Sequence, residues 1–276
     1  MRRFVLGAVM LGAVSGAHAA DMPDLPILRG AFTDGLTTTK VNWQGYYIGA
    51  QGGYGSSDEN FSGATGTMVA QILANTTIEN EMNVSQWPSG LGKSSARSSG
   101  FGGFAGYNSQ WDDVVIGVEA SYLHGNFGGS SSGSEERIAI LSDGYSHDVL
   151  STSTASIAIS DMATLRARAG YAFGSFLPYM FGGFALGDAD ISRTVAILDV
   201  PTFAGSPPPV SPLPIFTPSL SVTQHGHLIY GYSGGLGFDV NLIGGLFMRA
   251  EWEYIRFTDT IDTSINTARV GLGYKF

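Results

Sequence analysis

The chain has 276 residues, of which 14 are Lys or Arg and 23 are Asp or Glu, so its formal net charge is −9. This acidic balance argues against a nucleic-acid partner, because proteins that bind nucleic acids present a basic face. The sequence has no cysteine, which excludes disulfides, thiolate metal sites and a cysteine nucleophile. Burial and closure of the fold must therefore provide the stability.

Residues 1–19 have the pattern of a secretory signal peptide. Two arginines near the N-terminus precede an apolar stretch over 4–14, and small residues at Ala17 and Ala19 form a cleavage site. The pattern predicts export through the Sec pathway and cleavage after Ala19, so that Ala20 becomes the new N-terminus. Removing two of the 14 basic residues leaves 12 against 23 acidic ones, a net charge of −11. The segment that follows, residues 20–41, is expected to be a periplasmic N-terminal extension.

The composition of the remaining chain predicts membrane-spanning strands. Glycine occurs 39 times, 43% of residues are hydrophobic and only 13% are charged. No stretch after the signal approaches the roughly 18 apolar residues of a membrane helix. A chain of this kind can satisfy its backbone groups in a bilayer only as a closed β-barrel.

Alternation of large apolar with small or polar residues recurs in eight segments, each near the about 9–11 residues of a tilted membrane strand. The segments are 45–55, 99–108, 114–123, 162–173, 176–187, 228–240, 246–257 and 266–276. They predict an all-β fold, an eight-stranded antiparallel up-and-down transmembrane β-barrel over residues 42–276. In the fifth segment, Leu177, Tyr179 and Phe181 are expected on the outer face. A soluble β-sandwich also alternates, but Gly, Arg and Glu on the second face suit a polar lumen and not a dry core.

The gaps between these segments alternate in length. Long gaps at 56–98, 124–161 and 188–227 are separated by short ones of two to five residues, and a modest gap covers 258–265. Outer-membrane barrels have short periplasmic turns and longer extracellular loops. The long gaps are rich in Ser, Thr, Gly and Asn, so we expect them to be extracellular loops.

Charged residues lie on the predicted inner face of four strands, and we expect them to form a charge network in the lumen. A basic residue that faced the hydrocarbon at mid-membrane would cost about 2–4 kcal/mol. Counted in residues from the short turns, Glu119 and Arg168 should lie at similar depth in the membrane. Arg166, the next inward-facing residue on the same strand as Arg168, should lie further from the turns. Because eight strands enclose a space only wide enough for side chains, such a network should fill the lumen. Its expected members are Glu119, Arg166, Arg168, Arg249, Glu251, Glu253 and Arg269.

Five short pieces resemble the small outer-membrane immunogenic proteins of alphaproteobacteria, a porin-family group related to the OmpA-type barrel of Gram-negative bacteria. The pieces are Asn-Trp-Gln-Gly-Tyr-Tyr-Ile-Gly at 42–49, Leu-Arg-Ala-Arg-Ala-Gly-Tyr at 165–171, Phe-Leu-Pro-Tyr at 176–179, Ala-Glu-Trp-Glu-Tyr at 250–254 and Arg-Val-Gly-Leu-Gly-Tyr-Lys-Phe at 269–276. The resemblance implies an eight-stranded barrel whose loops face the surroundings of the cell. The long first and third gaps depart from the family, so no loop-borne activity is carried over.

The last strand carries a further implication of the resemblance. Val270, Leu272, Tyr274 and the terminal Phe276 have the aromatic carboxy-terminal pattern by which the barrel-assembly machinery recognises such proteins. The alternative is that Tyr274 and Phe276 simply belong to the aromatic girdle that flanks the lipid-facing band.

Several motifs that resemble catalytic or metal sites are expected to have no such role. Residues 231–235 match G-x-S-x-G, and residues 100–105 match a dinucleotide fingerprint, but both lie in alternating strands without the helix that each chemistry needs. His225 and His227 could form half of a metal site, yet no third ligand is identifiable. Asp188 and Asp190 could chelate a divalent ion beside lipopolysaccharide, although an ordinary charged strand end explains them as well. We expect neither catalysis nor a cofactor.

Two classes of function fit this sequence. The first, which we favour, is a structural and surface-interaction protein that supports membrane integrity, acts as a surface antigen and serves in adhesion. The second is a small porin or channel for solutes, and a haem-binding receptor or an outer-membrane enzyme fits less well. The expected partners are outer-membrane lipid and lipopolysaccharide, the barrel-assembly machinery, and a host or surface ligand at the loops.

Overall fold

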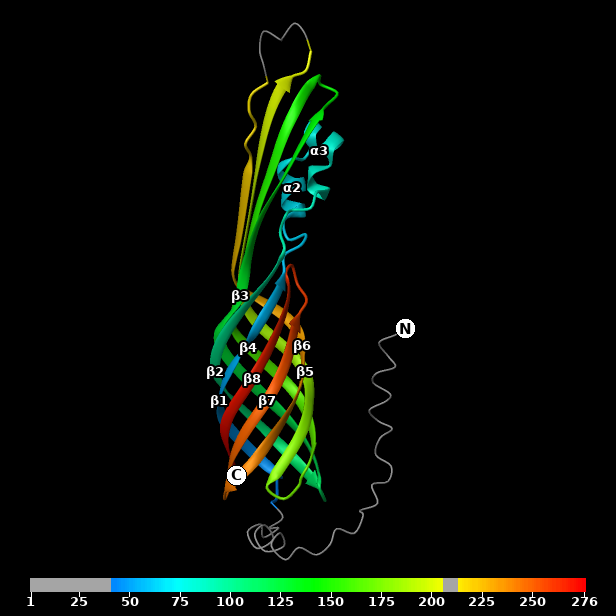
Figure 1. The fold of residues 1–276 in the computed structure, drawn as a ribbon. Coiled ribbons are helices and arrows are strands. Elements are labelled where there is room, and N and C mark those ends of the chain that lie inside the picture. The colour runs from blue at the N-terminus through cyan, green and yellow to red at the C-terminus, as the bar shows by residue number, and fades with distance from the viewer. Residues whose placement is uncertain (1–40, 206–212) are drawn as a thin grey trace, which may run out of the picture. The chain divides into compact units, whose positions relative to one another are not determined.

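A computed structural model describes residues 41–205 and 213–276, and in them eight antiparallel strands close into a barrel (Figure 1). Each strand pairs with its neighbours in sequence, and β1 closes the ring by pairing with β8. The strands are β1 (Gly45–Asn60), β2 (Lys93–Trp111), β3 (Val114–Ile140), β4 (Tyr145–Tyr171), β5 (Phe176–Phe203), β6 (Ser219–Ile243), β7 (Leu246–Phe257) and β8 (Asp262–Lys275). The expected fold class and strand order are confirmed. The cleavage site at Ala17, Ala19 and Ala20 lies outside the described residues, as does the expected N-terminal extension up to residue 40.

The barrel wall is apolar outside, and its inner face carries charged side chains between two apolar clusters, because side chains alternate between the two faces of each strand. On β7, for example, Met248 and Trp252 are exposed while Arg249 and Glu253 are buried. A soluble sandwich would show the opposite arrangement, with its apolar side chains buried. The outward apolar side chains therefore form a surface suited to lipid.

Paired aromatic side chains form a girdle around the end of the barrel that carries the short turns. Tyr46 lies 4.8 Å from Tyr107 across β1 and β2, and Phe176 lies 5.5 Å from Phe238 across β5 and β6, measured between ring centroids. Such rings, apolar but able to approach the headgroups, mark the boundary between hydrocarbon and water in membrane barrels.

The predicted orientation of β5 was wrong. Leu177, Tyr179 and Phe181 are buried in the lumen, whereas Met180 and Phe184 are exposed on the outer face. Both faces of this strand carry large apolar residues, so alternation alone did not distinguish them. The register with β4 and β6 fixes the orientation.

The prediction that 124–161 and 188–227 are loops was also wrong. Strands β3 to β6 continue well past the barrel as a four-stranded sheet, seen at the top of Figure 1. Register shifts near residues 125, 160 and 190 mark the point where this sheet leaves the ring. We call the sheet beyond these shifts the extension. Serine and threonine suit exposed strands as well as loops, and only the pairing shows which they form.

Two short helices and a 3-10 turn from the first long gap cover one face of the extension. They are α2 (Gly66–Ile72), α3 (Thr77–Met82) and η1 (Val84–Gln86). The apolar side chains Met68, Val69, Leu73, Ile78, Val84 and Trp87 pack against Leu141, Val149, Val195 and Ile197 of the sheet. The extension thus has a hydrophobic core of its own. No helix in the described parts of the chain is long and apolar enough to cross a membrane.

Candidate functional site: a charge network in the lumen

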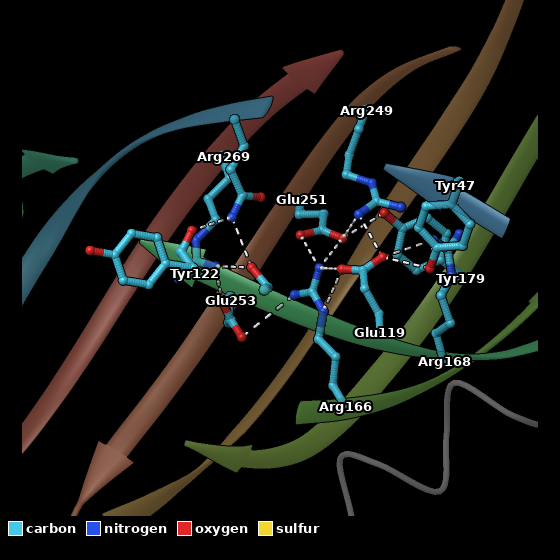
Figure 2. Close-up of polar contacts among 12 residues, drawn as sticks. Tyr47, Glu119, Tyr122, Arg166, Arg168, Tyr179, Arg249, Glu251, Glu253 and Arg269 are labelled. Atoms are coloured by element: carbon cyan, nitrogen blue, oxygen red, sulfur yellow. Dashed lines mark hydrogen bonds and ion pairs between the residues drawn. The ribbon is translucent and has the colours of Figure 1, made fainter. Parts of the chain in front are cut away.

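Glu119 on β3 is the centre of a network of charged side chains inside the barrel (Figure 2). Its Oε1 accepts a hydrogen bond from Nε of Arg166 at 3.0 Å, and its Oε2 accepts one from Nη1 of Arg249 at 2.7 Å. The Tyr47 hydroxyl donates to the same Oε2 at 2.7 Å, and Nη1 of Arg168 lies 3.4 Å from it. One carboxylate therefore joins three guanidinium groups that come from two other strands.

Asp239 on β6 is a second centre. Arg249 binds it through two parallel hydrogen bonds, Nε to Oδ1 at 2.8 Å and Nη2 to Oδ2 at 3.1 Å. Nη2 of Arg168 donates to Oδ2 at 2.7 Å. Paired contacts of this kind fix geometry as well as charge.

Glu251 and Glu253 on β7 complete the network. Nη2 of Arg166 donates to Glu251 at 2.7 Å, and the Tyr179 hydroxyl donates to Oε1 of Glu251 at 2.6 Å. Arg269 on β8 forms a 2.5 Å ion pair with Glu253, which also lies 3.5 Å from Nη1 of Arg166. Four arginines thus face four carboxylates, and none of the eight side chains belongs to a residue more than 5% exposed.

Aromatic rings lie against the guanidinium groups. The Cζ atom of Arg168 is 3.7 Å from the ring centroid of Tyr179, and that of Arg249 is 3.9 Å from Phe104. The planar guanidinium can stack on a ring while its edge donates hydrogen bonds. The rings therefore exclude water from the arginines without replacing their ion pairs.

The lumen is filled on both sides of the network. Towards the turns, an aromatic cluster includes Trp43, Phe104 and Phe247, and the indole of Trp43 donates to the Gly174 carbonyl at 3.2 Å. Towards the extension, an apolar cluster fills the barrel with the side chains of Phe61, Leu123, Phe127, Met162, Ile229, Ile255, Phe257 and Ile265. Side chains therefore occupy the interior along its length.

The structure brings all seven expected charged residues into one network, with one change of register. Arg166, and not Arg168, lies directly opposite Glu119, while Arg168 lies opposite Gly117. The sequence reasoning missed Asp239 as a member, although its inward position on β6 was visible in the alternation. It missed Tyr179 because the strand was assigned the wrong faces.

The two histidines and the G-x-S-x-G motif singled out in the sequence lie on β6. His225 pairs with Asp190 at 3.2 Å and His227 with Asp259 at 3.1 Å, so the two imidazoles have separate carboxylate partners. In residues 41–205 and 213–276, no three His, Cys, Asp or Glu side chains are grouped to hold a metal. Ser233 of the G-x-S-x-G motif is buried within β6, a strand that leads directly into β7.

The terminal strand places its four singled-out residues on the lipid-facing side. Val270, Leu272, Tyr274 and Phe276 are all exposed, and the Tyr274 and Phe276 rings contact each other at 5.3 Å. The Phe276 backbone N–H donates to the Tyr46 carbonyl at 2.9 Å. This arrangement fits an assembly signal and an aromatic girdle equally well.

A second ionic cluster lies in the extension, where His147 on β4 joins two aspartates. Its Nδ1 is 2.9 Å from Oδ2 of Asp199, and its Nε2 is 3.0 Å from Oδ2 of Asp143 in the β3–β4 turn. Burial alone would lower the pKa of His147, but the hydrogen bonds to Asp199 and Asp143 outweigh it and raise that pKa above its ordinary value. Only the protonated imidazole can donate to both carboxylates.

Comparison with known proteins places the chain in a family. Residues 6–276 match the family described as the outer membrane protein beta-barrel domain. The chain belongs to this family. As an outer-membrane β-barrel protein it is also similar to the 25 kDa outer-membrane immunogenic protein of Brucella ovis, at 24% identity over 175 residues. That alignment covers 63% of this chain and 62% of the relative, so the match spans less than two thirds of the relative's length.

Among solved structures, two proteins align over most of this chain. Ail of Yersinia pestis is 14% identical, with 84% of this chain and 99% of Ail covered and a TM-score of 0.35. Neisserial surface protein A is 11% identical, with 84% and 97% covered and a TM-score of 0.35.

Removing one carboxylate from the network should destabilise the barrel strongly. Glu119→Ala leaves three buried guanidinium groups short of a partner, so we expect a loss of about 3–5 kcal/mol in the free energy of unfolding. Urea unfolding in lipid vesicles measures it. The control is Glu135→Ala, which removes an exposed ion pair with Arg137 and should cost less than about 1 kcal/mol. Equal losses in the two variants would show that the lumen pairs are solvated.

The ionic cluster of His147 should make the extension most stable in mild acid. Because the pKa of His147 is raised on folding, its contribution is fully present below the unfolded value of about 6.5 and is lost as pH rises through the folded pKa. The pKa of Asp143 is lowered, since its hydrogen bonds to the Tyr145 N–H and to His147 outweigh the effect of burial, so its contribution is lost only at lower pH. Amide hydrogen exchange of residues 141–147 should therefore be slower at pH 5.5 than at pH 8, after correction for intrinsic rates. His147→Gln should abolish the difference, and its persistence in that variant would refute this origin.

Proposed function

We propose that this outer-membrane protein is a non-conducting barrel that holds its extension at the cell surface, with a structural and surface-interaction role. The observation that carries the proposal is the lumen network, in which eight charged side chains are paired and buried. A channel for solutes needs water beside its lining charges, as in wide porins. Here the four arginines and four carboxylates are matched in number, so the network carries no net charge.

The extension supports the surface role. Four long strands and the covering helices form a hydrophobic core beyond the barrel. Loops that only connected the barrel strands would need neither this sheet nor this core. The opposite end has only tight turns, such as Asp112–Asp113 and Gly174–Ser175. Long connections of outer-membrane barrels face outwards. We infer that the extension is extracellular, after Sec-dependent export and removal of residues 1–19.

Surface protease access tests this orientation. A protease site inserted between the exposed residues Ser62 and Gly63, near the helices, should be cut on intact cells. The matched insertion between Gly174 and Ser175 should be protected until the membrane is permeabilised. The reverse pattern would invert the proposed topology.

We also propose that the barrel-assembly machinery recognises the last strand, β8. Deleting Phe276 removes an exposed ring from the lipid-facing side and should leave most of the protein unassembled in the periplasm. The readout is the amount of heat-modifiable barrel in outer-membrane fractions. Val118→Ala is the control, since it removes an exposed apolar contact from the lipid-facing side of β3, outside the proposed signal, and keeps the terminal strand unchanged. Normal assembly of the truncated chain would contradict the signal role and leave Phe276 as a girdle residue.

A further inference from the structure

The face of the extension that points away from the helices carries a regular set of hydroxyl groups. On β4, Val149 and Ser153 face the helices, because Val149 packs in the helix-covered core and the Thr65 hydroxyl lies 3.1 Å from that of Ser153. The alternate residues therefore face the other way. These residues on β4 and their partners on β3 are Thr152, Thr154 and Ser156 with Ser134, Ser132 and Ser130.

The same rows continue across the remaining two strands. On β5, the residues paired with this β4 set are Ala196, Thr194 and Ser192. On β6, the residues paired with that β5 set are Ser219, Ser221 and Thr223. Three rows across four strands give twelve positions, and every one except Ala196 carries a hydroxyl. We call these twelve positions the hydroxyl array. From the usual strand spacing and rise, it measures about 14 Å across the strands and about 13 Å along them.

The array is an ordered and uncharged part of an acidic protein. The hydroxyls of Thr194 and Ser221 lie 2.9 Å apart, and those of Ser192 and Thr223 lie 3.4 Å apart, so neighbouring strands position them. Charged residues on the same face stand beyond the array, with Glu136 on the side of the tip and Asp190 on the side of the barrel. Every position of the array is exposed or half-buried.

This chemistry restricts the kind of ligand. The twelve positions contain none of the Trp, Tyr or Arg side chains that dominate protein–protein interfaces. They contain no Lys or Arg to hold phosphate. Hydroxyls both donate and accept hydrogen bonds. They fit a ligand that offers the same groups at a regular spacing and carries no charge, which is the description of a neutral polysaccharide.

The position of the array indicates where that polysaccharide comes from. The outward face of the extension continues the lipid-facing wall of the barrel on the same strands, from Leu165 in the apolar band through Asp161 to Ser156 on β4. Directly beyond the hydrocarbon, the saccharide part of the surrounding glycolipids must stand against this face. We propose that the hydroxyl array binds the neutral polysaccharide chains of the outer-leaflet glycolipid that surrounds the barrel. The location rests on the extracellular orientation proposed above.

The array suits weak binding repeated along a polymer. A single hydroxyl gains little from a sugar, since it exchanges one hydrogen bond with water for another. Several rows in register let one chain form many such contacts at once, and linked contacts strengthen one another through effective concentration. Threonine also loses little side-chain freedom on binding, because its branched Cβ already restricts χ1.

The test uses the full chain in phosphatidylcholine nanodiscs and lipid-free polysaccharide released by mild acid from smooth lipopolysaccharide. The variant replaces Thr152, Thr154, Thr194 and Thr223 by Val, which keeps the branched shape and strand preference but removes four hydroxyls. We expect the parent to bind the polysaccharide and the variant to bind at least about tenfold more weakly. The control replaces four exposed threonines outside the array, Thr67, Thr217, Thr258 and Thr260, by Val and should bind like the parent.

Heat-modifiable migration on a gel reports whether each variant is folded. A second array variant removes the middle row of hydroxyls and adds no branched apolar side chains; it replaces by Ala the residues Ser132, Thr154, Thr194 and Ser221. A parent that does not bind, or equal binding by parent and both array variants, would overturn the proposal. So would an equal loss in the array variant and the control. Because free polysaccharide reaches both sides of a nanodisc, this result does not depend on orientation. Failure of the protease test would therefore be distinguishable from failure of polysaccharide binding.

Discussion

The width of an eight-stranded lumen is the constraint on which the rest of this structure depends. Eight strands enclose a space that side chains just fill, so each inward residue must match its neighbours in size, charge and hydrogen bonding. Four arginines cannot face lipid, and in this lumen they are too deeply buried to be solvated by bulk water. Glu119 and Asp239 neutralise the charge of arginines and accept their hydrogen bonds, since each carboxylate accepts from at least two guanidinium groups.

The same constraint explains the small residues on the inner face. At Gly237 an added Cβ would lie 2.7 Å from Cγ of Glu251 and 2.9 Å from the Tyr179 hydroxyl. At Gly271 it would lie 2.7 Å from the Ala50 carbonyl oxygen. Glycine at these positions makes room for the long side chains of neighbouring strands. The glycine-rich composition is thus the counterpart of the arginines and aromatic rings that fill the barrel.

The architecture of the membrane part could be predicted from sequence because lipid imposes a strict rule on one face. Tyr230, Leu236 and Phe238 alternate with glycines and Asp239, and only a barrel with a polar interior accommodates that pattern. The rule does not distinguish the two faces of a strand where both carry large apolar residues, or where both are exposed to water. Leu177 and Tyr179 were therefore given the wrong face, and the Ser- and Thr-rich strands of the extension were mistaken for loops. The helices at 66–72 and 77–82 are too short for a periodic signal, and they are held by packing against the sheet.

The lumen network and the extension have separate physical roles. The network links strands of the barrel through buried ion pairs, whereas His147 and the helix-covered core stabilise the extension. Ion pairs gain strength when both partners are buried, and the burial of these eight side chains distinguishes a filled barrel from a pore. The two parts can therefore be altered independently by substitution.

Single-channel recording in planar bilayers tests the filled lumen most directly. The refolded parent protein is inserted, and the current is recorded across a range of voltages. A lumen that is filled by side chains and crossed by buried ion pairs predicts no steady conductance above the lipid baseline. Steady conductance in the nanosiemens range from the parent would contradict it, because water and ions would then pass the charges that this structure buries.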